Sequence, residues 1–516
     1  MVNDNTPVII GVGEASERID APGYEALSPA DLAGRAAVAA LNDASSMVAL
    51  APHIQLIAAI RQFEVSGPKV VAPFGKADNF PRAIAKRIGA DPARAILEPV
   101  GGQGPQHLVN ELAQLIGAGE LDLALICGSE AISTVRHLTS RGETRDWSET
   151  IGGQLEDRGF GEGLLTADLA RHGARTPISV YAMFENARRG RLGLDRADYA
   201  LEMGRLFAPF TQVAAKNSHA MSHEIHSAEA LAKVTASNRL TSDPYPRRMV
   251  ARDQANQGAA ILIASAGRAR ALGVPEDRLI YLHSGADVRE RTPMERKDLS
   301  ASPASVMAAQ RALDTAGISQ AQIDVFDFYS CFPIAVFNVR DGLGISGTDS
   351  RPLTVTGGLP FFGGAGNNYS MHAIASMVRR LRAEPTARGL VGANGGFLSK
   401  YSVGVYSARP APWRGFDSKA LQTEVDAWAA PALAAGSGEG VVDTYTIDYS
   451  GQALLGIVIG RLKADGARFV AMTDMADASI ARRMIEVDPL GATVTMTVND
   501  EGRSVIASYS PVAAAE

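Results

Sequence analysis

Two glycine-rich segments far apart in the chain share one local pattern. Residues 99–112 read PVGGQGPQHLVNEL, and residues 361–374 read FFGGAGNNYSMHAI. Each segment places Gly-Gly-x-Gly between an apolar stretch and a helix-like stretch. Three further pairs of similar segments occur in the same order, with nearly constant spacing between partners: residues 27–44 with 301–317, 54–60 with 323–329, and 123–133 with 389–399. We therefore expect a duplicated α/β unit.

Each repeat alternates short apolar stretches with stretches of helical periodicity. Such alternation predicts a mainly parallel sheet covered by helices in each half. Ser28 and Ser302 both precede a proline at a helix start. A serine followed by proline is typical of an N-cap and the first helical position. We expect both serines to cap a helix.

The rest of the chain divides around this repeat. We expect a first half over residues 1–265, with an inserted loop domain at about 132–249, and a second half over 266–408. Residues 409–436 are rich in Pro, Ala and Gly, which is typical of a linker. Short alternating stretches separated by turns fill residues 437–516. They predict a separate small β-barrel domain.

Composition excludes several classes of protein. The net charge is -6 and the sequence pI is about 5.9, which disfavours nucleic acid or an anionic membrane as partner. Cys127 and Cys331 are the two cysteines, too few for a disulfide framework or a cysteine-rich zinc site. The N-terminus lacks a leader pattern, and the apolar stretches are too short to span a bilayer. We expect a cytoplasmic protein with a small-molecule substrate.

Four segments are specific enough to indicate a family: PVIIGVGEAS, LDLALICGSEAIS, FYSCFPIAV and GGLPFFGGAGNN. Through these segments, residues 7–408 resemble the thiolase superfamily. The C-terminal segments GIVIGRLKADGARFVAM and DPLGATVTMTV resemble OB-fold domains of some thiolase-like proteins. The resemblance implies a duplicated thiolase fold with an OB-like barrel, similar to acetyl-CoA acetyltransferase-like proteins with an additional C-terminal domain. It also implies a coenzyme A thioester as substrate, no tightly bound cofactor, and a homodimer through the thiolase halves.

The resemblance also locates the site and shows that it is altered. The nucleophilic cysteine of the family falls on Gly102, so an acyl-enzyme is not expected there. The Asn-Glu-Ala-Phe or His-Asp-Cys-Phe motif becomes Tyr329-Ser330-Cys331-Phe332. The histidine of Gly-His-Pro falls on Gly364, and the late Cys-x-Gly becomes a segment around Asn394.

Candidate residues follow from these positions and from their chemistry. A helix start with free backbone N–H groups stabilises a carbonyl oxygen that becomes negative, and glycine lets a thioester approach closely. We expect catalytic roles for Tyr329, Cys331, His372 and Asn394. We expect oxyanion or substrate binding at Gly102, Gln103, Gly363, Gly364, Asn367, Asn368 and Tyr369, the last three also being readable as a helix cap and core packing.

Three further sequence features are weak functional signals, and each has a simpler explanation. Arg247 and Arg248 are candidates for the phosphates of coenzyme A, although an arginine pair is more often a solvated face. His219, His223 and His226 have helical spacing, but no carboxylate-rich partner is evident and no metal is expected. GVGEAS lacks the final glycine of a dinucleotide-binding motif.

Three functions remain open at this stage. The first is an acyltransferase on acyl-CoA or 3-oxoacyl-CoA thioesters that works without a cysteine acyl-enzyme. The second is a retro-aldolase on β-hydroxyacyl-CoA, with Tyr329 as base and the fused barrel in place of a partner subunit. The third is a protein that binds CoA esters without catalysis.

Overall fold

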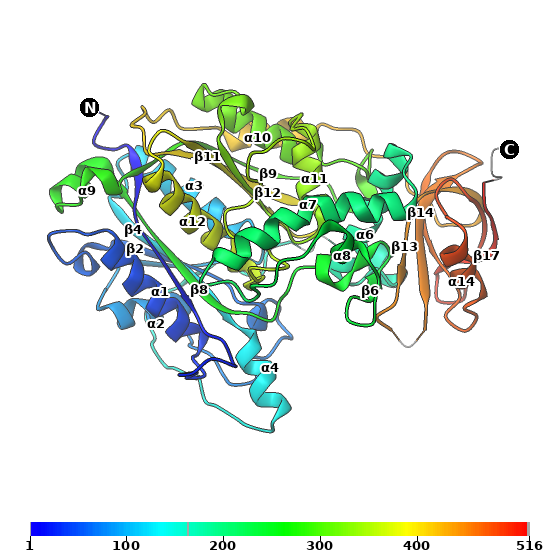
Figure 1. Ribbon diagram of the computed structural model, residues 1–516, viewed down its shortest axis with the longest axis horizontal. Coiled ribbons are helices and arrows are strands. Elements are labelled where there is room, and N and C mark those ends of the chain that lie inside the picture. The colour runs from blue at the N-terminus through cyan, green and yellow to red at the C-terminus, as the bar shows by residue number, and fades with distance from the viewer. Residues whose placement is uncertain (1, 163–164, 452, 513–516) are drawn as a thin grey trace.

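The chain forms an elongated molecule with a separate barrel at one end. The structure is a computed structural model that describes residues 2–162, 165–451 and 453–512. The blue-to-yellow part of the chain makes the main body in Figure 1, and the orange and red C-terminal barrel stands apart from it. The duplicated α/β body and the C-terminal barrel expected from the sequence are thereby confirmed.

One ten-stranded sheet runs through the main body and shows the duplication directly. Its strand order is β10-β11-β12-β9-β1-β8-β4-β2-β3-β5. The first half contributes β1 (Pro7–Ser16), β2 (Leu56–Ile60), β3 (Arg94–Glu98), β4 (Leu123–Ala131), β5 (Glu156–Asp157) and β8 (Asn256–Ser265). The second half contributes β9 (Ile280–Arg289), β10 (Val325–Phe328), β11 (Arg388–Gly395) and β12 (Lys400–Ser407). Read outward from the centre, β1-β8-β4-β2 in one half corresponds to β9-β12-β11-β10 in the other, as expected for a pseudo-twofold repeat.

The halves are mainly parallel, as expected, and one strand in each half runs against the others. The β2–β3, β2–β4 and β10–β11 pairs are parallel, but β8 lies antiparallel between β1 and β4. In the second half, β12 lies antiparallel between β9 and β11. Apolar periodicity finds buried strands but carries no information about their direction. The halves meet where β1 pairs antiparallel with β9.

Helices cover both outer faces of the sheet and fill the space between the halves. The helices α1 (Pro29–Asp43) and α2 (Phe80–Ile88) pack on the first half, while α10 (Pro303–Ala316) and α13 (Ser418–Asp426) pack on the second. Between the halves lie α3 (Gly104–Gly117) and α12 (Tyr369–Ala383), which contact each other and strands of both halves. The short helix α9 (Ala266–Ala271) follows β8, and α11 (Pro333–Gly342) follows β10. The two glycine-rich segments thus lead into the central helices.

The two predicted helix caps differ. Ser28 caps α1 through a capping box, in which its Oγ accepts from the Asp31 N–H and the Asp31 carboxylate accepts from the Ser28 N–H. The side chain of Ser302 does not cap α10, so that expectation is wrong. Glu290 instead accepts from the Ala304 N–H of its first turn. A residue distant in sequence has taken over the role of the local cap.

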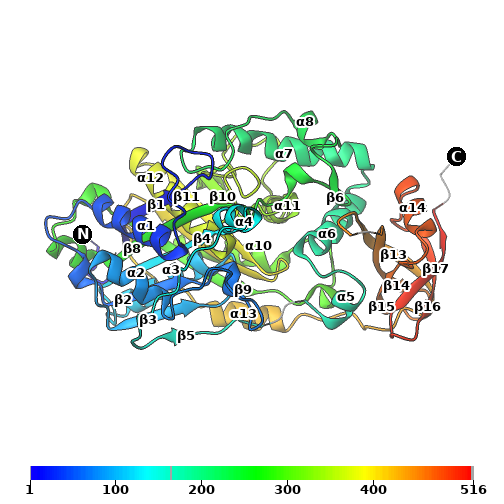
Figure 2. The same ribbon diagram turned by 90° about the horizontal axis from the view of Figure 1, so that it is seen from below.

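The inserted segment links the main body to the barrel. It contains α4 (Ile132–Ser140), α5 (Ala167–Arg171), α6 (Pro177–Leu192), α7 (Arg196–Lys216), α8 (Ala228–Ala232), β6 (Leu240–Ser242), β7 (Tyr245–Pro246) and the short 3-10 helix Arg247–Met249. Strand β6 pairs with the barrel, and Figure 2 shows α6 between the barrel and the rest of the chain. Arg189 of α6 forms an ion pair with Asp488, with 2.6 Å between Nη1 and Oδ2.

The barrel is closed by five strands. They are β13 (Gly438–Asp448), β14 (Leu455–Leu462), β15 (Arg468–Met472), β16 (Thr493–Val498) and β17 (Ser504–Ser510), with α14 (Ser479–Glu486) between β15 and β16. Pairing runs β13-β14-β15-β17-β16 and returns to β13, and only the β15–β17 contact is parallel. A buried apolar cluster around Tyr445, Val458 and Phe469 fills the interior. In the described part of the chain, no helix has the length and apolarity needed to cross a membrane.

Candidate active site

A cavity of about 690 Å³ lies where the first glycine-rich segment meets the ends of β10 and β11. Its polar lining includes Tyr329, Cys331 and Asn394, which the sequence predicted as site residues. Backbone of Gly102 and Gly364 also reaches it. The remaining wall is largely apolar and includes Phe63, Phe160, Ile178, Phe332, Leu359 and Phe397. An apolar cavity with a few convergent polar groups is the usual form of a small-molecule site.

Gly102 and Tyr329 are in close contact at the base of this cavity. A Cβ atom built on Gly102 would lie 2.3 Å from the Tyr329 hydroxyl oxygen and 2.7 Å from the carbonyl oxygen of Asn394. Both distances are shorter than a van der Waals contact. The Tyr329 phenol therefore fills the space that any side chain at residue 102 would need, the position at which the family resemblance predicts a nucleophilic cysteine.

Burial keeps the two titratable groups of the cavity neutral. Tyr329 is 8% exposed and Cys331 is 7% exposed. Burial raises the pKa of Tyr329 well above its ordinary value near 10. It also raises the pKa of Cys331 to about 12, although hydrogen bonds to Tyr181 and Asn394 act in the opposite direction. At neutral pH both side chains are therefore protonated. Each can donate a proton, and each must lose its own proton before it can act as a base.

A hydrogen-bonded cluster holds Asn394 beside Cys331. The Asn394 amide nitrogen donates to the Tyr181 hydroxyl over 2.7 Å and lies 3.8 Å from the Cys331 sulfur. Tyr181 donates in turn to the Gly396 carbonyl over 3.0 Å. Asn394 Oδ1 is buried and has no hydrogen-bond donor among the described residues. Among the described residues, this oxygen is therefore an acceptor of the cluster that receives no hydrogen bond.

The backbone donors of the two glycine-rich segments are not equivalent. Gly101 donates its N–H to the Asn367 side chain, whereas the Gly102 N–H has no acceptor among the described residues. In the second segment the Gly364 N–H donates to the Arg252 carbonyl over 2.7 Å. The Gly364 N–H is therefore already used, and the predicted contribution of Gly364 to substrate binding rests on its place in the cavity lining. Among the described residues, the Gly102 N–H is a free backbone donor of the first segment next to Tyr329.

Polar residues after the second segment hold the first segment in place. The Asn367 side chain accepts from the Gly101 N–H and donates to the Arg61 carbonyl over 2.8 Å. Ser370 donates its hydroxyl to the Gly102 carbonyl over 2.6 Å. Asn368 donates to the Gly128 carbonyl over 2.8 Å. Of these side chains, only Asn367 also lines the cavity.

His372 does not line the cavity, so the geometry gives its predicted catalytic role no support. It is fully buried on α12, and its Nδ1 lies 2.6 Å from Oε1 of Glu14 on β1. Arg379 pairs with the other carboxylate oxygen of Glu14. Burial alone would raise the pKa of Glu14, but His372 and Arg379 outweigh it and lower the pKa to about 2. The histidine thus belongs to a buried ion cluster between the two halves.

Several other predicted residues also lie outside the cavity lining. Tyr369 is fully buried, and its hydroxyl lies 2.6 Å from Thr356 Oγ1, which agrees with core packing. Gln103 lies against Gly395, so its carbonyl oxygen is buried rather than directed to a substrate. The other residues outside the lining are Gly363, Asn368, Arg247 and Arg248. The two arginines come just before Val250 and Ala251, which do line the cavity.

Among the lining residues that the sequence analysis did not predict are Tyr181 and Lys400. Tyr181 lies in the inserted helix α6, which has no counterpart in the second half and therefore no repeat to mark it. Lys400 begins β12 and donates to the Val100 carbonyl over 3.1 Å. Burial lowers the pKa of Lys400. The Lys-Tyr sequence at this strand start has no motif of its own, so only the fold reveals its position.

A group of possible metal ligands lies elsewhere, at Glu98, His107 and Glu111. Arg158 forms ion pairs with both glutamates, at 3.0 Å and 2.7 Å, and His107 Nδ1 lies 3.3 Å from Asp287. Burial would lower the pKa of His107, but the surrounding carboxylates raise it to about 9. The arginine supplies the positive charge at this position, and the group is interpreted as a charge network.

Comparisons with known proteins agree with this architecture. The family described as "Thiolase-like protein type 1 additional C-terminal domain" matches residues 420–502, beginning inside the segment expected as a linker. A comparison with curated proteins found no match. Among solved structures, the dimeric peroxisomal thiolase of Saccharomyces cerevisiae is 14% identical with a TM-score of 0.58. The match covers 79% of this chain and 98% of the yeast chain. A structure named "Ltp2-ChsH2(DUF35) aldolase" is 17% identical with a TM-score of 0.57, covering 78% of this chain and 98% of its own.

These two similarities show the thiolase fold. A much closer relationship exists with a monomeric SCP2-thiolase like protein type 1 from Mycobacterium smegmatis. It is 44% identical with a TM-score of 0.84, and the match covers 98% of this chain and 99% of that one. The chain therefore belongs to the family of SCP2-thiolase like proteins type 1, with a thiolase fold and an additional C-terminal domain.

Proposed function

We propose that this protein binds an acyl-CoA or 3-oxoacyl-CoA thioester in the cavity at Tyr329 and transfers an acyl group without an acyl-enzyme at residue 102. The observation that carries this proposal is the contact between Gly102 and Tyr329, where a phenol takes the space of the nucleophile. The apolar wall suits the acyl group. The protein's own groups then stabilise the carbonyl oxygen by hydrogen bonds and form no covalent bond to the acyl group. No tightly bound cofactor is needed.

The polar groups of the cavity supply the electrostatic part of such a reaction. The free Gly102 N–H and the neutral Tyr329 hydroxyl are donors for a carbonyl oxygen that becomes negative. In the cleavage direction, the thiol of an acceptor CoA attacks C3 of a 3-oxoacyl-CoA. The C2–C3 bond breaks, and C2 of the departing acetyl-CoA takes up a proton. Cys331, held beside Asn394, is the group proposed to move the proton at C2.

A retro-aldolase is the second candidate, and the position of Tyr329 favours it. In this reaction a β-hydroxyacyl-CoA loses its hydroxyl proton, the Cα–Cβ bond breaks, and Cβ becomes a carbonyl. Because burial keeps Tyr329 protonated, the phenol would accept that proton while passing its own to Cα. The fold-level similarity to an aldolase with a DUF35 partner supports this reading, with the fused barrel, proposed to be of OB type, in place of the partner.

Binding without catalysis is the third candidate. The protonated states of Tyr329 and Cys331 support it, because neither group is a ready base at neutral pH. The sequence-based expectations of a homodimer and a cytoplasmic location remain predictions. Light scattering tests the first, and the M. smegmatis relative is described as monomeric.

Turnover of matched 3-oxoacyl-CoA and 3-hydroxyacyl-CoA series by the purified protein separates the three candidates. Acyl transfer is expected from the 3-oxo series with CoA as acceptor. Aldehyde or ketone release from the 3-hydroxy series supports the lyase, and saturable binding without turnover of either supports the third candidate. Intact-mass measurement after acid quench is expected to show no acyl adduct. An adduct that disappears in Cys331→Ala would overturn the proposal and make Cys331 the nucleophile.

A further inference from the structure

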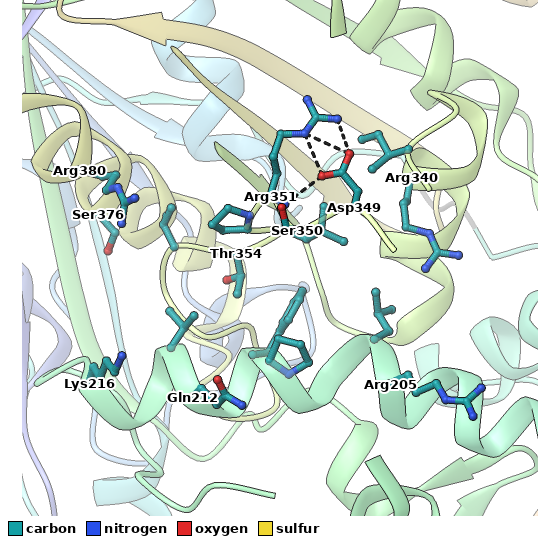
Figure 3. Close-up of a pocket in the computed structure, with 18 of the residues that line it drawn as sticks. Arg205, Gln212, Lys216, Arg340, Asp349, Ser350, Arg351, Thr354, Ser376 and Arg380 are labelled. Carbon is teal, nitrogen blue, oxygen red and sulfur yellow. Dashed lines mark hydrogen bonds and ion pairs between the residues drawn. The ribbon is translucent and has the colours of Figure 1, made fainter. Parts of the chain in front are cut away.

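A second, larger cavity of about 1190 Å³ lies between α7, the loop of residues 345–355, and α12. It shares no lining residue with the cavity at Tyr329. Figure 3 shows α7 along one side, with Arg205, Gln212 and Lys216 directed from it, and Arg380 and Ser376 on α12 across the cavity. Its volume is somewhat larger than the range of about 300–1,000 Å³ that is usual for small-molecule sites.

Basic side chains dominate the charged lining. They are Arg205, Lys216, Arg340, Arg351, Arg379 and Arg380, against Glu202 and Asp349. Four of these bases already have carboxylate partners. Arg340 pairs with Asp341, Arg351 with Asp349, Arg379 with Glu14, and Arg380 with Glu384.

Arg205 and Lys216 are the exceptions. Within the described ranges, neither has a carboxylate oxygen within 4 Å, although Glu229 lies near enough to feel the charge of Arg205. Both side chains are exposed and belong to the lining of the cavity. Two unneutralised cations therefore face a concave surface, which concentrates anions.

These two cations are far apart and have apolar surface between them. They are three helical turns apart on one face of α7, a separation of about 16 Å at 1.5 Å per residue. Arg205 has Arg340 on its side of the cavity, and Lys216 has Arg380 across from it (Figure 3). Leu206, Phe210 and Val213 of α7 line the cavity in between, opposite Ile345, Leu353 and Val355.

We propose that this second cavity binds an amphiphilic diacid, a small molecule with an apolar chain between two acidic groups. One acidic group would pair with Arg205 beside Arg340, and the other with Lys216 beside Arg380. The apolar middle of the cavity matches the chain and disfavours a uniformly charged polymer. The acidic groups can be carboxylates or phosphates, because both accept from arginine and lysine. This site is independent of the function proposed for the cavity at Tyr329.

Calorimetric titration of the full-length protein with dodecanedioate tests the proposal, with dodecanoate and 1,12-dodecanediol as comparators. The diacid is expected to bind more tightly than the monoacid, and the diol least. Arg205→Gln with Lys216→Gln is expected to weaken diacid binding by roughly fivefold to thirtyfold, the scale of two partly exposed ion pairs. Dodecane-1,12-bisphosphate distinguishes phosphate from carboxylate preference, and tighter binding of either supports the site.

The matched control is Arg145→Gln with Lys86→Gln, which removes the same charge at two exposed positions away from this cavity. It is expected to leave diacid binding unchanged. Equal binding of diol and diacid would overturn the proposal, as would equal weakening in the control pair. Loss of diacid binding in Tyr181→Phe but not in the Arg205 and Lys216 pair would place the ligand in the other cavity and also overturn it.

Discussion

The two glycine-rich segments share one sequence pattern but have different structural roles. The first, around Gly102, faces the cavity and presents a free N–H beside Tyr329. The second, around Gly364, has its N–H bonded to Arg252, and the residues after it hold the first segment through Asn367 and Ser370. The second segment thus lines the cavity through Gly364 and Asn367 and also holds the first segment in place.

Polar side chains in and after the second segment can therefore hold the first segment in place rather than contact a substrate. His372 is the clearest case, since it lies on the helix after the second segment and contacts Glu14 of the first half. The chemical groups come instead from the turn after β10, where Tyr329 and Cys331 meet the first segment.

Glu14→Gln is expected to lower the free energy of unfolding by about 3 kcal/mol or more, because it leaves His372 and Arg379 without their buried carboxylate. Urea unfolding at pH 7 measures the change. Glu384→Gln, at the C-cap of α12, is the control, and its partly exposed pair with Arg380 is expected to contribute less than about 1 kcal/mol. Equal losses in the two variants would mean that the buried cluster does not support the second segment.

The same cluster predicts a pH dependence. The pKa of Glu14 is about 2 in the folded protein, below its ordinary value of 4.5. The unfolded chain therefore binds this proton first as the pH falls. The contribution of Glu14 is fully present above about pH 4.5 and is lost as the pH falls toward 2. Glu14→Gln is expected to flatten the wild-type stability curve in that range.

Substitution of the two titratable groups in the cavity separates the proposed reactions. For an acyltransferase, Cys331→Ser is expected to lower turnover by on the order of 10² or more, and Tyr329→Phe by less. For a retro-aldolase, Tyr329→Phe is the crippling change and Cys331→Ala is nearly silent. An unchanged melting temperature excludes a packing effect. Full turnover in all three variants would show that the turn after β10 does not carry the chemistry.

The sequence predicted the repeat and the positions of its strands well, because buried strands leave apolar stretches in a fixed order. It did not identify β8 and β12 as the strands that run against the rest of their halves, because apolarity does not encode strand direction. It located Tyr329, Cys331 and Asn394 in the cavity through motif positions. It missed Tyr181 because the inserted helix has no repeat partner. It placed His372 at the site because His372 follows a glycine-rich loop, but closeness in sequence does not determine which face of a helix points to the cavity.

A matched pair of glycine substitutions compares the two segments directly. Gly102→Ala is expected to lower the free energy of unfolding by about 1 to 3 kcal/mol, since its Cβ would meet Tyr329 at 2.3 Å and backbone at 2.7 Å. Gly364→Ala is expected to cost less, because the nearest atom to its Cβ is 3.2 Å away. Thermal unfolding of both variants checks the difference. A larger loss at Gly364 would reverse the assignment of the crowded position to the first segment.

Ser370→Ala should give the smallest effect and the sharpest test of support between the segments. It removes the hydroxyl that donates to the Gly102 carbonyl over 2.6 Å, which is expected to cost about 1 kcal/mol in unfolding free energy. The control is Ser376→Ala, one and a half turns further along α12, where the serine lines the second cavity and has no hydrogen bond among the described residues. Because Ser370 fixes the residue that carries the free N–H, its loss should also weaken binding of acyl-CoA severalfold while the control leaves binding unchanged. If Ser370→Ala lowers stability but leaves acyl-CoA affinity intact, the second segment braces the fold without positioning the donor at Gly102.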